Sequence, residues 1–412
     1  MSGVSITKVK PGFYEKTLLK LLSAMRFGRL ELTLPDGEQL IFGNGIGNIS
    51  ANISVKDPYF FKRCILYGDI GFGESYVEGE WDTHSIQNVI SWIILNIENA
   101  PGVSGSKVSG VFQNVLRFLN RFSHNQRSNS LSGSRRNISE HYDLNNAFFG
   151  LFLDPSMTYS SAYFVTENMS LEDAQMAKYD RLCKELRLKK NDRVLEIGSG
   201  WGANAIFIAK NYGCQVTSVT ISEEQYKYAK EKIEKEKLSD KITLLLKDYR
   251  DLEGKFDKIV SIEMLEAVGA EYYNSYFKKC SSLLNKEGIL ALQVITCPDS
   301  RFESLKKGVD WIQKHIFPGS LLPSVAAINQ SVNEVSDLTL VDLKDIGMDY
   351  ANTLNIWQKN FNNKISEVKR LGFDDYFIRK WNYYLSYCEA AFAMRNINVM
   401  QMVYTRPNNT LR

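Results

Sequence analysis

A run of glycines after an apolar stretch is the feature of this sequence with the clearest chemical meaning. Residues 194–202 read Val-Leu-Glu-Ile-Gly-Ser-Gly-Trp-Gly, which predicts a buried strand, a glycine-rich turn and then a helix over 203–212. Such a turn lets backbone N–H groups approach a ligand at the positive end of a helix. The spacing also resembles a dinucleotide fingerprint, and a purely structural strand–turn–helix is a third interpretation.

Two residues favour S-adenosylmethionine over a dinucleotide. A dinucleotide site needs an acidic residue about 20 residues further on to hold the ribose, whereas the next expected strand ends in Thr220. Glu196 would place a negative charge close to a pyrophosphate, but it suits the cationic amino-acid end of S-adenosylmethionine. The sequence therefore predicts a methyltransferase-type cofactor site.

The elements around this run alternate as in a doubly wound α/β sheet. Strands are predicted at 193–197, 215–220, 242–246, 258–262 and 289–295, and helices at 223–236 and 272–284. Polar residues stand at the strand ends: Glu196, Thr220, 247–249, Glu263 and Gln293. Because ligands bind beyond the carboxyl ends of such strands, these side chains favour one shared pocket.

Composition divides the chain into three parts. We expect a smaller N-terminal α+β domain over 1–100, a basic, serine-rich linker over 101–140 and a catalytic domain over 141–412. The first part is predicted to hold a helix at 17–26, a hairpin of 29–34 with 39–42, a strand at 48–55 and a loop–helix junction over 69–81. In the linker, residues 111–122 have helical apolar spacing beside Arg117 and Arg121. That helix either packs on its own domain or lies on anionic lipid.

Charge and composition exclude several classes of protein. A net charge of +3 does not indicate a nucleic-acid partner. The six cysteines are scattered and there are only four histidines, so we expect no metal site and free thiols in a reducing cytoplasm. No signal peptide is recognisable and no apolar run reaches the ~18 residues of a membrane span. Any membrane contact is therefore expected to be peripheral.

From Tyr142 to the C-terminus, and less strongly over 68–83, the sequence resembles the cyclopropane fatty acid synthase family. The motifs that carry the resemblance are 142–149, 153–160, the glycine run, 220–225, 248–251, 263–269, 316–319, Asp349-Tyr350 with Trp357, and 383–388. The segment 263–269, Glu-Met-Leu-Glu-Ala-Val-Gly, is most similar to the plant-type subgroup.

The resemblance implies a Rossmann-like class I methyltransferase sheet of seven strands and a specific reaction. The methyl group of S-adenosylmethionine would be added as a methylene to a cis double bond of an unsaturated phospholipid acyl chain. It further implies a homodimer that contacts the inner face of the membrane peripherally. Two alternatives stay open: a related methyltransferase without ring closure, acting on lipid carbon or on a small amine, and a lipid-binding relative that has lost catalysis.

The same resemblance assigns roles to individual residues. Residues implied to bind the cofactor are Tyr159, Ser160, Glu196, Gly198, Ser199, Gly200, Gly202, Thr220, Gln225, Tyr249 and Arg250. An apolar cluster suited to an acyl chain contains Phe148, Phe149, Phe152 and Phe317.

In this family the base is thought to be a bound bicarbonate. By motif position its holders would be Glu266, Tyr350, Gln293 and the backbone at Ser161 and Ile295. Ser161 stands where relatives usually have Cys, and Gln293 stands where many have His, which a Gln amide cannot replace as a proton shuttle. Cys388 matches a cysteine once proposed as a nucleophile, although a buried helix thiol is the simpler interpretation.

Overall fold

The computed structural model describes residues 12–97 and 146–410, which form two compact units. One unit contains residues 12–97 together with 373–394, and the other contains residues 146–372 together with 395–410. The expected catalytic range 141–412 is therefore interrupted, because helix α16 (Asp375–Ala393) packs against helices of the first unit. The basic linker expected at 101–140 lies outside the described residues.

The first unit is a small α+β structure. Its elements are α1 (Phe13–Ser23), β1 (Arg29–Thr33), β2 (Gln39–Phe42), β3 (Ser50–Val55), α2 (Tyr59–Val77), β4 (Trp81–Asp82) and α3 (Ile86–Leu95), and the sheet order is β2-β1-β3-β4. The predicted hairpin is confirmed, with Thr33 opposite Gln39. The loop–helix junction predicted over 69–81 is wrong for most of its length. Helix α2 runs on to Val77 past a kink at Gly68, where φ is 60°.

Arg379 adds polar contacts to the packing of helix α16 against α2 and α3. The Arg379 guanidinium donates to the carbonyl oxygens of Tyr76 and Trp81 and pairs with Asp82 at 3.1 Å. It also lies 4.1 Å from the centre of the Tyr76 ring. These contacts join residues about 300 positions apart, so no local sequence pattern could have reported them.

The second unit contains a seven-stranded sheet in the order β10-β11-β9-β8-β5-β6-β7. The strands are β5 (Arg193–Ile197), β6 (Gln215–Thr220), β7 (Ile242–Leu246), β8 (Phe256–Ile262), β9 (Leu284–Thr296), β10 (Thr339–Asp345) and β11 (Asn398–Thr405). Strand β11 pairs antiparallel with both of its neighbours, and the β9-β8-β5-β6-β7 pairs are parallel. All five predicted strands and the expected number of strands are confirmed.

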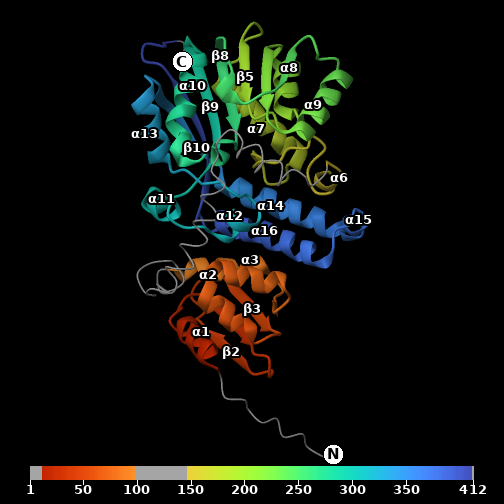
Figure 1. The fold of residues 1–412 in the computed structure, drawn as a ribbon, viewed down its shortest axis with the longest axis vertical. Helices are drawn as coiled ribbons and strands as arrows, with labels where there is room; N and C mark the ends of the chain where they lie inside the picture. The colour runs from red at the N-terminus through yellow and green to blue at the C-terminus, as the bar shows by residue number, and fades with distance from the viewer. Residues whose placement is uncertain (1–11, 98–145, 411–412) are drawn as a thin grey trace, which may run out of the picture. The chain divides into compact units, whose positions relative to one another are not determined.

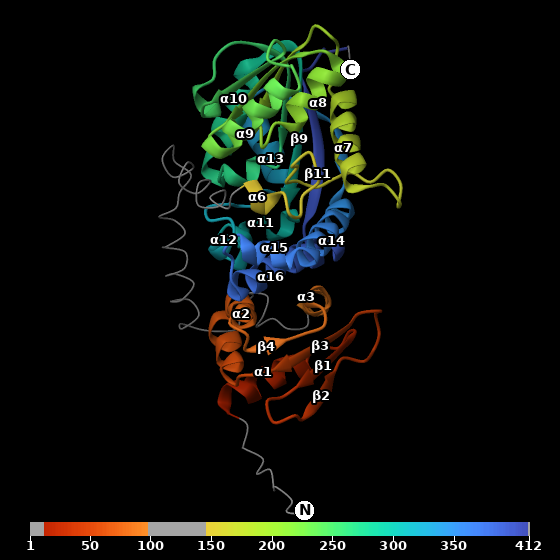
Figure 2. The ribbon, with the colours of Figure 1, turned by 90° about the vertical axis from the view of Figure 1, so that its right-hand side faces the viewer.

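Helices cover both faces of this sheet, as Figures 1 and 2 show. Buried side chains of α10 (Tyr273–Leu283) and α13 (Val325–Val335) pack with the strands on one face. On the other face lie α7 (Leu171–Glu185), α8 (Ala203–Tyr212) and α9 (Glu223–Lys235). Burial on both faces explains why the central strands β5 and β8 are buried along most of their length rather than at alternate residues.

The remaining elements of the second unit are short helices and α14. They are α6 (Asn146–Phe149), η2 (Tyr249–Asp251), η3 (Leu265–Ala267), η4 (Ala270–Tyr272), α11 (Asp299–Leu305), α12 (Trp311–His315), α14 (Gly347–Asn363) and α15 (Ile365–Arg370). Across residues 12–97 and 146–410, no helix combines the length and the apolar character needed to cross a bilayer.

Candidate active site

The glycine run forms the tight turn that the sequence predicts, between β5 and α8. The amides of Gly198 and Ser199 both donate to the carbonyl of Val219, at 3.0 and 2.9 Å, and the amide of Gly202 donates to Ser199. Three of the backbone amides expected to contact the ligand therefore form hydrogen bonds that close the turn. Gly200 has a φ of +49°, and a Cβ built on it would meet nothing within 4 Å. A ligand can approach the backbone most closely there.

Glu196 ends up buried at the end of β5, with both carboxylate oxygens engaged. The side chain of Asn204 donates to one oxygen at 2.8 Å and the hydroxyl of Ser218 donates to the other. Burial raises the pKa of Glu196 to about 7, although both hydrogen bonds act to lower it. No cation neutralises this carboxylate in the contacts that the structure records, so a positively charged group brought to it would favour its ionised form.

The residues expected at the ribose and the adenine lie beyond β6 and β7. Thr220 donates to Gln225 at 3.0 Å and accepts from the amide of Ser222. Arg250 makes two contacts with Asp248, at 2.9 and 2.8 Å, and its guanidinium lies 5.6 Å from the centre of the Tyr249 ring. These polar side chains therefore stand at the carboxyl ends of neighbouring parallel strands, as predicted.

Three of the four expected acyl-chain residues, Phe148, Phe149 and Phe152, form an aromatic cluster. Phe148, Phe149 and Phe152 are fully buried, whereas Phe317 is half-buried in the segment after α12. The Phe149 ring lies 5.1 Å from Trp201 of the glycine turn and 5.3 Å from Tyr159. The cluster thus joins the predicted cofactor turn to an apolar wall.

Glu263 is the centre of a connected group of hydrogen-bonding residues in the second unit. Its Oε1 atom accepts from the backbone N–H of Ser161 at 2.9 Å and from the side-chain amide of Gln293 at 2.8 Å. The hydroxyl of Tyr350 also hydrogen-bonds to this carboxylate. Three of the groups expected to hold bicarbonate therefore meet on Glu263, which the sequence marked only as a polar residue at a strand end.

The backbone of Glu263 is held in an unusual conformation. Its φ is +48°, in the left-handed region that non-glycine residues rarely occupy. The amide of Glu263 donates to the carbonyl of Gln293 at 2.7 Å, so the strand β9 backbone fixes it. Such strain persists only where surrounding contacts impose it, and it often accompanies function.

Glu266 lies one short turn further along and is also buried. One carboxylate oxygen accepts from the amide of Ile295 at 2.6 Å, while the other has no hydrogen-bond partner. Burial first, and the nearby charge of Glu263 second, raise the pKa of Glu266 to about 8. At neutral pH this group is therefore mainly the protonated acid, with one oxygen aimed at no protein donor.

A chain of side chains runs from the Glu263 group across the sheet. Gln401 donates to the Oε1 atom of Gln293 at 2.8 Å and accepts from Arg181 at 2.6 Å. Arg181 also pairs with Asp342 at 3.0 Å. Gln293 and Gln401 are fully buried and lie directly opposite each other on β9 and β11. Sequence reasoning missed Gln401 and Arg181, because neither lies in a recognisable motif.

A buried lysine completes the electrostatics. Lys178 donates to the hydroxyl of Ser160 and to the side-chain oxygen of Gln175, both at 2.7 Å. Burial lowers the pKa of Lys178 and raises that of Glu263, and their opposite charges counteract both shifts. This lysine was also missed, since helix α7 shows it only as one of several basic residues.

The loop that carries Tyr159, Ser160 and Ser161 is fixed to α14. The amide of Ala162 donates to Thr353 at 3.1 Å and that of Phe164 donates to Asp349 at 2.8 Å. Tyr350, on the same helix, is buried with its ring 6.0 Å from Trp357. The loop residues and Tyr350, which the resemblance assigns to one site, therefore lie on segments that are bonded to each other.

Cys388 lies in α16, which belongs to the first unit. The other predicted catalytic residues, which are Ser161, Glu266, Gln293, Ile295 and Tyr350, all belong to the second. A role for Cys388 in the reaction stays a prediction. Among the described residues no cluster of three His, Cys, Asp or Glu side chains could hold a metal ion.

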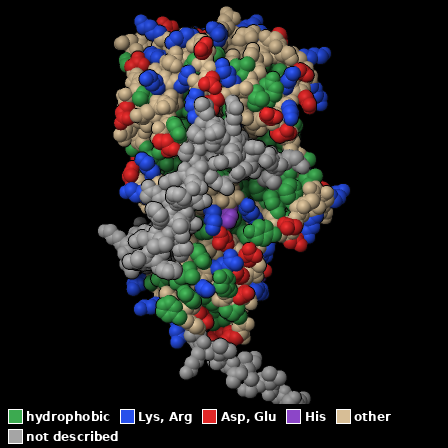
Figure 3. All heavy atoms as spheres, in the orientation of Figure 1, with side chains coloured by type: hydrophobic (Ala, Val, Ile, Leu, Met, Phe, Trp, Pro, Cys, Tyr) green, Lys and Arg blue, Asp and Glu red, His purple; other side chains and the backbone are tan. Residues whose placement is uncertain are grey.

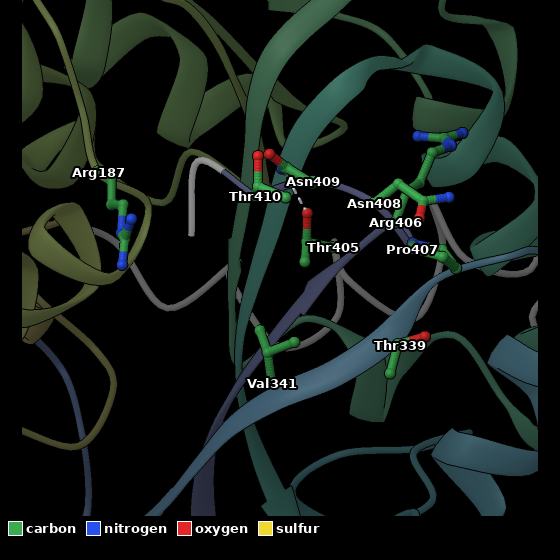
Figure 4. Close-up of a pocket in the computed structure, with 9 residues that line it drawn as sticks. All are labelled: Arg187, Thr339, Val341, Thr405, Arg406, Pro407, Asn408, Asn409 and Thr410. Atoms are coloured by element: carbon green, nitrogen blue, oxygen red, sulfur yellow. Dashed lines mark hydrogen bonds between the residues drawn. The ribbon is translucent and has the colours of Figure 1, made fainter.

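An open pocket lies at the opposite end of the sheet (Figure 4). It is lined by Arg187, Thr339, Val341 and residues 405–410. Thr405 pairs with Ile289 near the start of β9, so this pocket is at the amino ends of the parallel strands. Ligands of parallel sheets bind at the other edge, and the pocket does not contain any predicted site residue.

Residues 129–402 match the family described as mycolic acid cyclopropane synthetase. The chain belongs to this family. It is 38% identical over 387 residues to the cyclopropane-fatty-acyl-phospholipid synthase of Escherichia coli (strain K12), a match that covers 91% of this chain and 96% of that protein. It is 36% identical to the tuberculostearic acid methyltransferase UfaA1 of Mycobacterium tuberculosis, over 84% of this chain and 81% of that protein.

Solved structures show the same fold. The cyclopropane synthase MmaA2 of Mycobacterium tuberculosis has a TM-score of 0.61 at 27% identity, covering 66% of this chain and 98% of its own. The mycolic acid cyclopropane synthase CmaA1, complexed with SAH and CTAB, has a TM-score of 0.61 at 28% identity and the same coverage. These matches confirm the family resemblance and the Rossmann-like methyltransferase fold.

Proposed function

We propose that this protein is an S-adenosylmethionine-dependent cyclopropane synthase that acts on unsaturated acyl chains of phospholipids. The observation that carries the proposal is a pair of neighbouring carboxylates, Glu263 and Glu266, at the edge of the sheet where the methyl donor is expected. The side chain of Met264 connects them to the glycine turn, since a Cβ on Gly198 would lie 3.3 Å from its Cγ atom. Methylation of an alkene needs such a proton acceptor.

The chemistry explains why. S-adenosylmethionine, when bound, supplies an electrophilic methyl group on a sulfonium. An isolated alkene is a weak nucleophile, so the chain must hold the reactants close together and exclude water. The aromatic cluster of Phe149, Phe152, Tyr159 and Trp357 supplies apolar, π-rich walls that favour a developing cation. Ring closure then requires that one proton leave the former methyl group.

A separate bicarbonate base fits these residues poorly. The amide of Ser161 and the side chains of Gln293 and Tyr350 already bind Glu263, and the amide of Ile295 already binds Glu266. A further anion would lie against two carboxyl groups, with few donors left to hold it. Bicarbonate therefore stays a prediction of the resemblance alone.

The lipids themselves supply the test of the reaction. The full chain is incubated with S-adenosylmethionine and vesicles of dioleoyl phosphatidylglycerol and phosphatidylethanolamine, and the acyl chains are measured by mass spectrometry and proton NMR. We expect a gain of one CH₂ and cyclopropane proton signals. A gain of CH₂ with a methyl branch indicates methylation without ring closure. No lipid product, with turnover on small amines, would replace the proposal by amine methylation.

A lipid substrate implies contact with a membrane, and we propose that this contact is peripheral and lies at its inner face. On the face shown in Figure 3, basic and acidic side chains are interspersed over the second unit. A basic anchor is instead offered by the sequence of 101–140, which has six basic residues and one acid. We expect binding to anionic vesicles to weaken as salt rises.

Charge reversal tests this anchor. Changing Arg117, Arg121 and Arg127 to Glu is expected to weaken sedimentation with anionic vesicles by about 1 kcal/mol per residue. The matched control reverses Lys227, Lys230 and Lys235, which are exposed on α9, and is expected to bind as the unchanged protein does. Salt-independent binding that the first variant retains would refute the anchor. The homodimer stays a prediction, for which sedimentation velocity is the measurement.

A further inference from the structure

We propose that the carboxylate of Glu263 is itself the group that accepts the proton during ring closure, in place of a separate anion. This inference rests on the proposed function and adds a catalytic residue to it. The donors expected to surround bicarbonate surround a carboxylate of the protein instead. A carboxylate and a bicarbonate present similar oxygen acceptors to such donors.

The hydrogen bonds around Glu263 fix it as an acceptor. A backbone N–H, an amide NH₂ and a phenol O–H come to it from Ser161, Gln293 and Tyr350. The first two share its Oε1 atom, at 2.9 and 2.8 Å. Donors of this kind favour the ionised carboxylate. Lys178 adds a positive charge nearby without a direct hydrogen bond among its recorded contacts.

The direction of the Gln293 amide is determined by Gln401 on the neighbouring strand β11 and by Arg181 on α7. Arg181 has only donors, so the atom of Gln401 that faces it at 2.6 Å must be the oxygen. The NH₂ group of Gln401 then faces Gln293, which must offer its own oxygen at 2.8 Å. Gln293 is left to donate its NH₂ group to Glu263 and to the carbonyl of Ser161. Arg181 thereby keeps a donor aimed at Glu263.

Position and accessibility agree with this role. Glu263 is half-buried, and as a residue it keeps more exposed surface than Glu266, which is 8% exposed. Glu263 has a φ of +48° and follows directly after β8. It therefore lies at the edge of the sheet where the glycine turn follows the neighbouring strand β5. Glu266 already spends one oxygen on the amide of Ile295. The arrangement gives the two carboxyl groups different tasks.

The step balances without another reactant. The alkene π electrons form a bond to the methyl carbon while the C–S bond breaks and its electron pair stays on sulfur. The positive charge moves from sulfur to the alkene carbon. Glu263 then takes one proton from the former methyl group, and the C–H electron pair forms the second ring bond. The products are the cyclopropane, S-adenosylhomocysteine and the neutral acid of Glu263, which releases its proton to solvent.

The test compares two substitutions in buffer stripped of carbon dioxide, with dioleoyl phosphatidylglycerol vesicles. The unchanged protein is expected to form cyclopropane lipid at the same rate with and without added bicarbonate. Glu263→Gln keeps the shape but loses the acceptor, and we expect turnover to fall about 10²–10⁴-fold. Glu263→Gly suits the left-handed backbone and leaves the donors of Ser161, Gln293 and Tyr350 open to a small anion. We expect bicarbonate or formate to raise the rate of this variant roughly tenfold or more.

Controls and contrary outcomes are distinct. Glu271→Gln removes an exposed carboxylate from η4, and Lys237→Gly places a glycine at another left-handed position; both are expected to behave as the unchanged protein does. S-adenosylmethionine affinity by calorimetry shows that each variant is folded. If the unchanged protein forms cyclopropane lipid only when bicarbonate is added, Glu263 is not the acceptor. If no lipid product forms under any condition, the proposed function falls, and this inference with it.

Discussion

Glu196 and Glu263 stand at the ends of neighbouring parallel strands, yet the protein treats the two carboxylates differently. Glu196 lies inside β5, opposite Ser218, and is bound by two short side chains, those of Asn204 and Ser218. Glu263 lies one residue past β8 in a left-handed conformation. Its donors come from a loop, a strand and α14. The partners of Glu196 thus lie within one packed region, whereas the partners of Glu263 come from several separate elements.

The contrast shows how one sheet edge can prepare two kinds of charge. Ionising Glu196 without a ligand costs about 3 kcal/mol, since burial raises its pKa from 4.5 to about 7. An arriving cation offsets that cost, so the site is suited to bind a positive charge. Burial raises the pKa of Glu263 as well, but three hydrogen-bond donors and the charge of Lys178 act against that rise, so they favour its anion before substrate arrives. One carboxylate is suited to binding and the other to proton transfer.

The largest effect that separates the two is expected from Gly200→Val, which touches only the binding side. A valine at a φ of +49° is strained by about 1–3 kcal/mol, and its side chain enters the open space where the ligand approaches. S-adenosylmethionine affinity in calorimetry is expected to fall about 10²-fold or more. Gly254→Val, at an exposed turn with a φ of +100°, is the matched control and is expected to bind normally. Retained affinity in Gly200→Val would contradict the site.

Tyr350→Phe acts on the proton-transfer side alone. It removes the hydroxyl that hydrogen-bonds to Glu263 and changes little volume. We expect cyclopropane formation to slow by about 10–10²-fold with unchanged cofactor affinity, because the carboxylate loses one of its donors. Tyr404→Phe removes a buried hydroxyl that bonds Asn329 at 2.8 Å, near the amino end of β9, and is expected to turn over normally. Equal losses in both variants would indicate a general packing effect.

Much of the fold could be predicted because its signals are local. Strands 193–197, 215–220 and 242–246 have the bounds that apolar runs between glycine and polar residues indicated. The hairpin before residue 43 followed from alternation and its turn residues. The assignment of 373–394 to the first unit could not be predicted, since it depends on packing and on Arg379 contacts about 300 residues apart. Pattern alone also hid the length of α2.

The candidate site divides in the same way, into residues that a local motif indicates and residues that only long-range contacts bring together. Glu196 was recognisable because it belongs to a contiguous motif. The centre at Glu263 was missed because Ser161 lies 102 residues earlier and the polarity of Gln293 is set by Gln401 and Arg181. A positive φ at a glutamate cannot be read from a sequence. Motif position assigned the catalytic role to Glu266, the second glutamate of Glu-Met-Leu-Glu. Motif position does not report which of the two glutamates receives the hydrogen bonds.

Protonation state separates Glu266 from Glu263 in the proposed reaction. With a pKa of about 8, Glu266 is mainly neutral at pH 7, so Glu266→Gln replaces a neutral acid by a neutral amide. We expect turnover at pH 7 to fall only about tenfold or less, well below the loss for Glu263→Gln. Above pH 8 the native Glu266 side chain ionises, so the loss of turnover caused by Glu266→Gln is expected to differ there from the loss at pH 7. A pH 7 loss as large as that of Glu263→Gln would mean that Glu266 works as an anion.

The pH dependence of cofactor affinity isolates Glu196. Its pKa of about 7 means that it is protonated at pH 5.5 and largely ionised at pH 7.5. Because a cation binds the ionised form, affinity is expected to weaken by about tenfold as the pH falls between these values. The methyl donor's own α-amino group, with an ordinary pKa of about 7.7–8.0, stays mainly protonated over this range. Glu196→Gln is expected to bind weakly at both values and to lose the dependence.

The smallest effect is expected from Arg181→Met, which leaves both carboxylates in place and removes the donor that orients the amide chain, together with the ion pair to Asp342. Without the Arg181 guanidinium, which only donates, the side-chain amide of Gln401 can rotate by 180°. The amide of Gln293 can then rotate as well and present its oxygen to Glu263. If about half of the molecules still hold Gln293 with its NH₂ group toward Glu263, the rate falls only a few-fold. We therefore expect turnover to fall about 2–5-fold with unchanged cofactor affinity. Arg181→Lys keeps a donor and is expected to recover most of the rate. Arg395→Met removes an exposed arginine that pairs with Asp345 of the same edge strand, and it is the matched control. A loss that Lys does not recover, or that Arg395→Met shares, would show that Arg181 acts through its packing or its charge rather than by orienting Gln293.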